Sequence, residues 1–342
     1  MIKRNGAVLA MLLALVSSAA SAASAASAAS AGGGAFLPAL VSYGPRNDQS
    51  FNEMAYAGAE RYKKTFGARY LEIQVSNEAQ KEQALRAMAR RKANMVVAVG
   101  FAFRPAVETV AREFPRTRFV IIDSEAVGNN VSGVVFRQEE GAFLVGMAAA
   151  LKSTSKRVGF IGAMDVPLIR SFGCGYAQGV RHADAGVEVL SNMVGSTPAA
   201  FYDPGRGAEI ARSQFDRGVD VIFAAAGPTS IGMMQQARAQ RHFAIGVDSN
   251  QNGLFPGVVL TSMVKRADTA VFDAMKEGRA GRWRSGTHTL GLKEGGVDWA
   301  LDEHNRGLVT AGMEQRVEAA RADIVAGRLK VVDYRKANSC PV

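Results

Sequence analysis

One pattern recurs in RVGFIGAMDVP (157–167), DVIFAAAGPTS (220–230) and HFAIGVDSNQ (242–251), where a short apolar run ends in a glycine-rich or acidic turn. Each run is rich in β-branched or aromatic residues, as expected of a strand that is buried on both faces. The intervening residues 205–217 and 231–240 have helical periodicity. Strands that alternate with helices predict βαβ units, and therefore a parallel sheet flanked by helices.

The residues that end these runs are the first candidate site. In open parallel sheets, ligands bind beyond the carboxyl ends of the strands. Asp165, Gly227 and Asp248 stand at those ends. We therefore expect them to face a ligand.

The first half of the chain has the same alternation. Strands are predicted at residues 36–42, 69–75, 95–100, 118–123 and 131–136, and helices at 51–64, 77–92 and 104–113. A helix at 138–151 begins a second series, and the later segments are strands at 258–263 and 286–292 and helices at 267–276 and 314–326. Two consecutive series predict an α/β protein with two doubly wound parallel-sheet lobes.

The chain is predicted to cross between the two lobes three times, near Phe136, Met263 and Leu290. The N-terminal lobe would comprise residues 36–137 and 265–290, and the C-terminal lobe residues 138–264 and 291–342. A cleft between two such lobes can enclose a ligand when the hinge closes.

The first residues have the pattern of a cleavable leader. Lys3 and Arg4 precede an apolar run at 7–16, and residues 20–22 match the A-x-A cleavage pattern. Residues 1–22 are therefore interpreted as a signal peptide and residues 23–35 as a low-complexity spacer. Because no cysteine lies near the cleavage region, we expect a soluble periplasmic protein without a lipid anchor.

Composition argues against other function classes. The formal charge is +10, and without Lys3 and Arg4 the chain has 39 basic and 31 acidic residues, or +8. The basic residues are scattered singly and are not interleaved with aromatic residues, which argues against nucleic-acid binding. After the leader, no segment approaches the ~20 apolar residues of a membrane helix.

The sequence has two cysteines, Cys174 and Cys340. In an exported protein such a pair favours a disulfide over a metal site or a nucleophile. That bond would fasten the C-terminal tail to the helix near Phe172. The alternative is two unpaired thiols.

The sequence contains no recognisable catalytic constellation. Dinucleotide, P-loop, G-x-S-x-G and H-E-x-x-H patterns are missing, and Gly173, Gly175 and Gly179 have the wrong spacing for a dinucleotide fingerprint. The histidines (His182, His242, His288, His304) are far apart in sequence and lack metal-ligand spacing. We therefore expect a binding protein with no catalytic residues, metal or cofactor.

Several ordered segments resemble the basic membrane protein (BMP) family. They are DQSFN (48–52), FVIIDS (119–124), FRQEEGAFLVGMAAAL (136–151), GFIGAMDVPLI (159–169), YDPGRGAEIA (202–211), GVDVIFAAAG (218–227), IGVDSNQ (245–251) and SMVKR (262–266). Members are solute-binding proteins of ABC importers, and the characterised ones bind purine nucleosides. The resemblance covers about residues 36–330. It implies a type I periplasmic-binding-protein fold with a three-segment hinge, and an inner-membrane permease as partner. We expect the protein to be a monomer.

The resemblance also implies roles for matching residues. Phe51 and Phe201 would sandwich the purine, and Asn52 and Asp123 would bind the base edge. Asp248 would accept the ribose hydroxyls, with Lys265 and the Gly227 backbone beside it. Asp48 would shape the loop and can touch the base.

These roles agree with the chemistry of a nucleoside. A base stacked on an aromatic ring gains about 1–3 kcal/mol, and a carboxylate at a strand end can accept both hydroxyls of a ribose diol. Lys265 near Asp248 would keep that carboxylate ionised.

Each role has a structural alternative. Phe51 could pack the first helix, and Tyr202 could replace Phe201 as the stacking ring. Asp123 and Asp248 could be helix N-caps, and Lys265 could be a surface residue.

The chain also departs from the family pattern. It lacks a lipid-acceptor cysteine, and the loop at 44–47 and the turn at 227–229 are unusual. Arg46 or Arg170 at the cleft could select a more acidic purine. Alternative functions are binding of a free base or another small polar solute, a periplasmic ligand-sensing module, and a nucleoside-cleaving enzyme.

Overall fold

The structure is a computed structural model that describes residues 36–126 and 128–342. The predicted signal peptide (1–22) and spacer (23–35) lie outside the described residues. Residues from Leu37 to Val342 form one unit. Among the helices of this described part, none combines the length and the apolar character needed to cross a membrane.

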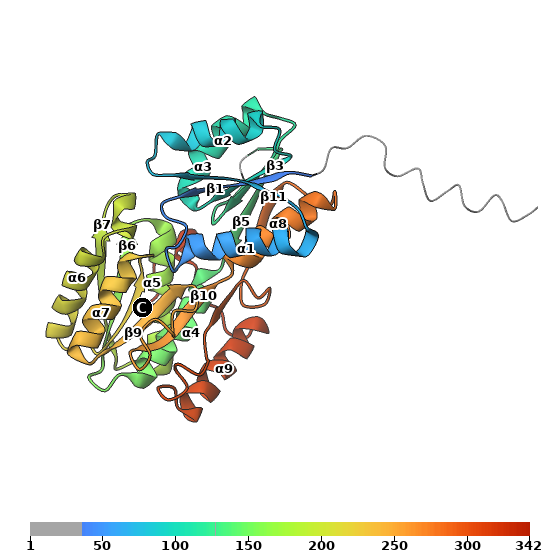
Figure 1. The fold of residues 1–342 in the computed structure, drawn as a ribbon. Helices are drawn as coiled ribbons and strands as arrows, with labels where there is room; N and C mark the ends of the chain where they lie inside the picture. The colour runs from blue at the N-terminus through green and yellow to red at the C-terminus, as the bar shows by residue number, and fades with distance from the viewer. Residues whose placement is uncertain (1–35, 127) are drawn as a thin grey trace, which may run out of the picture. The chain divides into compact units, whose positions relative to one another are not determined.

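The first sheet has six parallel strands in the order β11-β5-β4-β3-β1-β2 (Figure 1). Their bounds are β1 Pro38–Tyr43, β2 Leu71–Val75, β3 Met95–Val99, β4 Arg118–Ile122, β5 Val131–Phe136 and β11 Gly286–Leu290. The helices of this lobe are α1 Phe51–Phe66, α2 Gln80–Arg90, α3 Arg104–Glu113 and α8 Ala267–Arg279. β3 is buried along its whole length, which explains why its sequence is a continuous apolar run.

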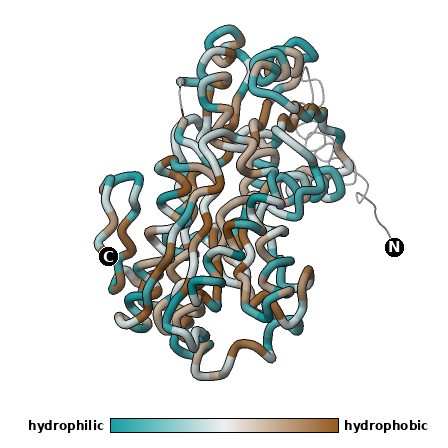
Figure 2. The backbone as a smooth tube through the Cα atoms, turned by 90° about the vertical axis from the view of Figure 1, so that its left-hand side faces the viewer, coloured by the Kyte–Doolittle hydropathy of each residue, from teal (hydrophilic) through white to brown (hydrophobic). Residues whose placement is uncertain are grey.

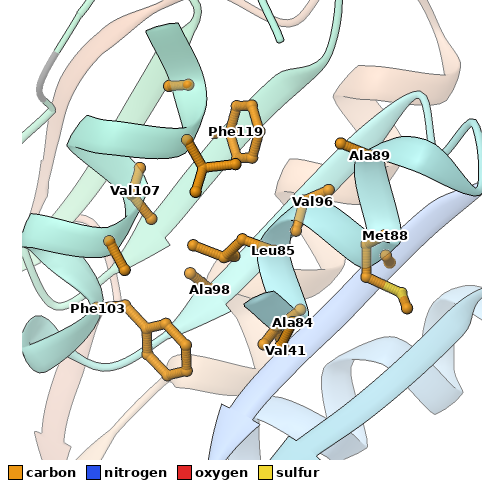
Figure 3. Close-up of a cluster of buried hydrophobic side chains, with 14 of the residues drawn as sticks. Val41, Ala84, Leu85, Met88, Ala89, Val96, Ala98, Phe103, Val107 and Phe119 are labelled. Atoms are coloured by element: carbon orange, nitrogen blue, oxygen red, sulfur yellow. The ribbon is translucent and has the colours of Figure 1, made fainter. Parts of the chain in front are cut away.

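One hydrophobic core lies between this sheet and helices α2 and α3 (Figure 3). Val96, Ala98 and Phe119 project from the strands toward Leu85 of α2 and Val107 of α3. All of them are fully buried. The apolar stripes of the two amphipathic helices therefore cover one face of the sheet.

The second sheet has the order β12-β10-β9-β8-β6-β7. Its strands are β6 Arg157–Met164, β7 Glu188–Gly195, β8 Val221–Ala225, β9 Phe243–Asp248, β10 Val259–Lys265 and β12 Val297–Trp299. Only β12 pairs antiparallel, with β10. The helices are α4 Gln138–Lys152, α5 Pro167–Ala183, α6 Pro204–Asp216, α7 Thr229–Gln240 and α9 Ala311–Val325, followed by the short α10 Tyr334–Ala337.

Glycines let helices α4 and α5 pack closely. A Cβ atom at Gly175 or Gly179 would collide with the backbone of α4, and one at Gly146 would collide with the backbone of Tyr176. The glycine string at 173–179 is therefore a helix-packing feature.

The two sheets repeat one arrangement. β1, β3 and β4 occupy the places in the first sheet that β6, β8 and β9 occupy in the second. Figure 2 shows hydrophobic colour along the inner strands and hydrophilic colour toward the periphery of both lobes. The predicted α/β class with two doubly wound lobes is confirmed.

The chain passes between the lobes after β5, after β10 and after β11, as the three-segment hinge requires. The lobe boundaries at 137/138, 264/265 and 290/291 stay a prediction. Two strands, β7 and β12, were not predicted: β7 lies at a sheet edge and is mostly exposed or half-buried, and β12 has only 3 residues.

Candidate functional site

The carboxyl ends of the strands in both sheets surround a cavity of about 120 Å³. A single water needs roughly 10–15 Å³ on this scale, so the cavity can hold an organic molecule. All ligand-binding residues predicted from the sequence line it: Asp48, Phe51, Asn52, Asp123, Phe201, Gly227, Asp248 and Lys265. The fold therefore brings these distant residues together.

Most of the wall is apolar or aromatic, and much of it was not predicted. The additional lining residues include Tyr43, Phe101, Phe103, Leu168, Ile169, Phe172 and Pro198. Phe101 and Phe103 form a short 3₁₀ turn after β3. Only their place after a strand end could have indicated a site, because their sequence reads as ordinary core.

Phe201 and Tyr202 both line the cavity, so the choice between them as the stacking ring stays open. Phe201 ends a 3₁₀ turn and lies against Gly227, which has a φ of 54°. The Tyr202 hydroxyl donates to the Tyr43 carbonyl at 3.1 Å, and the two rings are 6.1 Å apart. Tyr202 therefore connects the second lobe to the first.

Asp48 holds the loop that begins α1. Its carboxylate accepts the backbone N–H groups of Ser50, Asn52 and Glu53 at 2.9–3.0 Å. Such bonds satisfy donors that a helix N-terminus leaves free. Burial raises the pKa of Asp48, and the three N–H donors oppose that rise. The predicted loop-shaping role of Asp48 fits this arrangement.

Asn52 turns its amide nitrogen away from a ligand. Nδ2 donates to the carbonyls of Tyr43 at 2.8 Å and Pro45 at 3.1 Å. The amide oxygen is the group that Asn52 can offer as an acceptor in the cavity.

Lys265 is buried and pairs with Asp123, not with Asp248 as predicted from the sequence. Its ammonium group also lies 5.3 Å from the Phe51 ring, 5.1 Å from the Phe136 ring and 5.2 Å from the Phe172 ring. Asp248 already accepts a hydrogen bond from Ser50, whereas Asp123 has no other donor among the described residues. A buried cation is stabilised by the carboxylate that would otherwise be unpaired. The surface-lysine alternative is wrong.

Asp248 ends β9 with its carboxylate at the cavity. Ser50 Oγ donates to its Oδ2 at 2.7 Å. Burial raises the pKa of Asp248 to about 6, and Lys265 and the Ser50 hydrogen bond oppose that rise. The carboxylate is thus ionised at neutral pH but close to its titration range.

Asp123 and Asp248 occupy equivalent strand ends in the two sheets, and both have a positive φ, 72° and 65°. Few residues other than glycine adopt this conformation, although aspartate tolerates it better than most. Within residues 36–126 and 128–342, no helix N–H donates to either carboxylate, so neither is an N-cap. Such strain is often found at binding sites.

The loop before α1 is bonded across the cleft to the segment after β9. The Gln49 carbonyl accepts Ser249 Oγ at 2.6 Å and Gln251 Nε2 at 2.7 Å. Together with the bond between Ser50 and Asp248, these contacts join the two lobes.

Other expected site residues lie elsewhere. Asp165 and Arg170 form an ion pair with half-exposed side chains, and Arg46 lies over the Tyr56 ring. None of them lines the cavity, so the structure does not place Arg46 or Arg170 where it would contact a ligand there. The structure joins Cys174 to Cys340 in a disulfide. In the described part of the chain, no group of three or more His, Cys, Asp or Glu is arranged to hold a metal ion.

Comparison with known proteins gives a consistent result. Residues 37–331 match the family model Bmp, described as "ABC transporter substrate-binding protein PnrA-like". The "ABC transporter nucleoside-binding protein BmpA" of Lactococcus lactis is 29% identical over 83% of this chain and 85% of its own length. An uncharacterized lipoprotein of Pyrococcus abyssi is 32% identical over 85% of this chain and 72% of its own length.

A solved structure shares the fold. The crystal structure of an ABC-transporter solute-binding protein from Aeropyrum pernix K1 superposes with a TM-score of 0.77 and 29% identity. It covers 87% of this chain and 93% of the other.

Proposed function

Because the chain belongs to the Bmp family of ABC-transporter substrate-binding proteins, we propose that its cavity captures a purine nucleoside for delivery to a permease. The chain thereby has the periplasmic-binding-protein fold, with the ligand cavity between its two lobes. The observation that carries the proposal is a buried carboxylate, Asp248, facing a cavity whose other walls are mostly aromatic and apolar.

Asp248 suits the ribose. An ionised carboxylate only accepts hydrogen bonds, and a diol supplies two O–H donors in reach of one carboxylate. One oxygen of Asp248 is already bonded to Ser50, which fixes the orientation of the group. A charge-assisted bond of this kind contributes about 1.5–3 kcal/mol.

The aromatic walls suit the base. Phe51 from the first lobe and Phe201 or Tyr202 from the second present rings to one cavity. A purine offers a flat π surface that such rings bind without demanding one hydrogen-bond pattern. The amide oxygen of Asn52 and the carboxylate of Asp123 provide acceptors for N–H groups at the base edge.

A relative supports this ligand class. The Lactococcus lactis protein is named nucleoside-binding, and this chain covers 85% of its length. In this chain, the cavity is lined by aromatic rings that suit a base and by carboxylates that suit hydroxyl and N–H donors.

The proposal includes export in a soluble, monomeric form. The leader-like residues 1–22 support export. Cys174 and Cys340 are joined to each other in the disulfide. Intact-mass analysis of the mature protein from the periplasmic fraction tests this: a mass increase of a diacylglycerol or acyl group would contradict it.

Native mass spectrometry of freshly purified protein tests the proposed ligand. We expect a bound species whose extra mass matches a purine nucleoside, lost after unfolding and refolding in ligand-free buffer. A retained sugar or other non-purine solute, together with no binding of added purine nucleosides, would contradict the proposal.

A further inference from the structure

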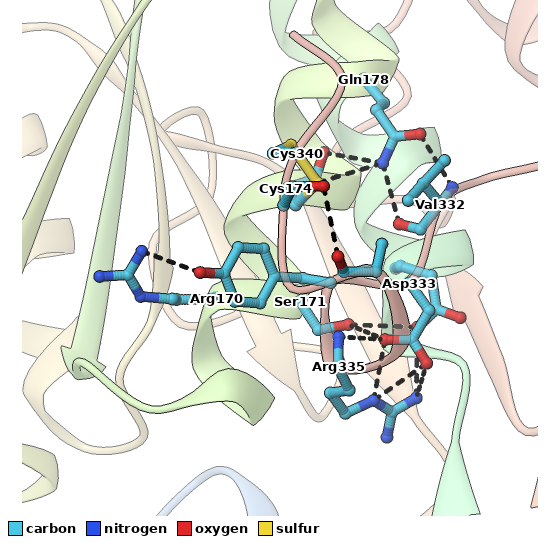
Figure 4. The surroundings of a disulfide bond; sticks show 12 residues. Arg170, Ser171, Cys174, Gln178, Val332, Asp333, Arg335 and Cys340 are labelled. Carbon is cyan, nitrogen blue, oxygen red and sulfur yellow. Dashed lines mark hydrogen bonds and ion pairs between the residues drawn. A yellow bond between two sulfur atoms is a disulfide. The ribbon is translucent and has the colours of Figure 1, made fainter.

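The C-terminal tail is fastened along one face of helix α5 (Figure 4). Cys340 is bonded to Cys174, and the Gln178 side chain exchanges two hydrogen bonds with the backbone of Val332, at 2.9 and 3.0 Å. Ser171 Oγ donates to Asp333 at 3.2 Å. Residues 171, 174 and 178 are three and four positions apart, so they share one face of the helix. We call residues 332–340 the tail strap.

The tail strap carries Arg335 to the first crossing between the lobes. Arg335 donates from Nε and Nη2 to Asp333, at 2.9 and 3.0 Å. Its Nη2 also donates to the carbonyl of Phe136 at 2.9 Å and lies 3.5 Å from the Glu139 carboxylate. Phe136 ends β5, and Glu139 lies in the first turn of α4, so the guanidinium spans the segment where the chain changes lobe.

A second crossing lies beside the same residues. The N–H of Arg137 donates to the carbonyl of Leu290 at 3.0 Å, where β11 ends and the chain returns to the second lobe. Arg335 contacts the first crossing at Phe136, and the neighbouring residue Arg137 is hydrogen-bonded to the end of β11. The contact of Arg335 therefore lies beside two of the three hinge segments.

Phe136 connects this contact to the cavity. Its ring is fully buried and lies 5.1 Å from Lys265 Nζ. Lys265 in turn pairs with Asp123, and both line the cavity. A shift of the Phe136 backbone would move a ring that packs on the buried cation of the site, because side chains in a close-packed interior move together.

We infer that Arg335 is a positioning residue for the ligand site, held in place by the disulfide-fastened tail strap and acting through the Phe136 carbonyl on the hinge. It touches no ligand. It fixes the crossing segment, and through it the Phe136 ring and the pair of Lys265 with Asp123.

Arg335→Met and Arg335→Lys, made in the full mature chain, test this inference. The matched control is Arg316→Met, because Arg316 also donates to a backbone carbonyl, that of Ala183 at 2.9 Å. This bond is exposed and joins α9 to the end of α5, neither of which is a crossing segment. Affinity for inosine is measured by calorimetry well below the unfolding temperature, and amide hydrogen exchange is followed in peptides covering residues 131–140. The choice of inosine rests on the proposed function.

We expect Arg335→Met to weaken inosine binding about tenfold and to speed exchange at residues 131–140. The lysine variant, which keeps a cation beside Asp333 and Glu139, should lie between it and the wild type, and Arg316→Met should match the wild type. Unchanged affinity and exchange in Arg335→Met would overturn the inference. If the wild type bound no purine nucleoside, the proposed function would fail, and the exchange data alone would still decide the role of Arg335.

Removal of the disulfide is the second test of this inference. The Cys174→Ser/Cys340→Ser variant should speed exchange at residues 131–140 in the same direction as Arg335→Met. If that variant does not fold, wild-type protein reduced with dithiothreitol replaces it. If amide hydrogen exchange at residues 131–140 kept its wild-type rate after loss of the disulfide, Arg335 would not need the tail strap. That result would overturn this part of the inference.

Discussion

Ser50 and Asp248 are hydrogen-bonded across the ligand cavity, with Ser50 Oγ donating to Asp248 Oδ2 at 2.7 Å. The two residues are 198 positions apart in sequence and belong to different lobes. The carboxylate assigned to the ribose is therefore also a contact that holds the lobes together. Under the proposed function, ligand binding and lobe closure would share one group.

Replacing Ser50 by alanine should weaken nucleoside binding. The buried Asp248 oxygen would lose its donor, which costs about 1–3 kcal/mol, equivalent to about a 5- to 150-fold loss of affinity. Because the proposed ligand would have to leave from between the two lobes, we expect most of the loss as faster dissociation, measured by stopped-flow fluorescence.

Ser249→Ala is the matched control for that change. Ser249 also donates across the cleft, to the Gln49 carbonyl, but this bond is exposed to water. Its loss should change affinity by at most a few-fold. Equal effects of the two substitutions would contradict a special role for Ser50.

Nucleoside affinity should fall as the pH decreases below about 6. Burial raises the pKa of Asp248 to about 6 in the free protein, and only the ionised form can accept both hydroxyls of the ribose. In the limit well below that pKa, each pH unit reduces affinity about tenfold. The same shift affects folding. Because the pKa of Asp248 in the folded state lies above its ordinary value of 3.8, burying the ionised group lowers the free energy of unfolding at neutral pH. Protonation between about pH 6 and 4 removes this destabilisation.

Calorimetry from pH 5 to 8 checks the binding profile, with Asp248→Asn as the control. The asparagine variant lacks the titrating group and should show a flatter profile. Glu139, whose pKa burial raises to about 7, remains in both proteins. If the variant kept the full wild-type pH dependence, another group would be responsible.

Phe51→Ala should weaken a free purine base and its nucleoside by similar factors, because the ring contributes stacking and not a ribose contact. The expected loss is about 1–3 kcal/mol per stacked base. Phe66→Ala is the control on the same helix, since Phe66 stacks on Phe272 outside the cavity. That control should lower the melting temperature and leave the dissociation constant unchanged. A nucleoside-only effect of Phe51→Ala would contradict stacking.

Reduction of the Cys174–Cys340 disulfide should destabilise the protein. The bond closes a loop with a sequence separation of 166, and the chain-entropy model assigns such a loop about 5 kcal/mol. Thermal unfolding with and without dithiothreitol measures the effect, and the Cys174→Ser/Cys340→Ser variant should not respond to the reductant. Two thiols titratable in the denatured, unreduced protein would show that the bond is not formed.

The buried parallel strands could be predicted from the sequence because burial on both faces imposes continuous apolar runs, as in β3 and β8. The edge strand β7 lacks that constraint and was missed. Asp248 could be predicted as a lining residue because it ends a strand, although the same pattern also selected Asp165, which does not line the cavity. Asp123 was predicted through the resemblance to the BMP family. The partner of Lys265 could not, since it depends on how the two lobes place Asp123 and Ser50 around the cavity. Phe172 was missed as a lining residue because an aromatic residue on a helix reads equally well as core.

The central claim is that Asp248 recognises the ribose of a purine nucleoside. Calorimetric titration of wild-type protein and Asp248→Ala with a nucleoside and with its free base tests it most directly. We predict a loss of about 10- to 150-fold for the nucleoside, as expected for charge-assisted hydrogen bonds of about 1.5–3 kcal/mol, and a much smaller loss for the base. Equal losses for both ligands, or no loss for either, would contradict the claim.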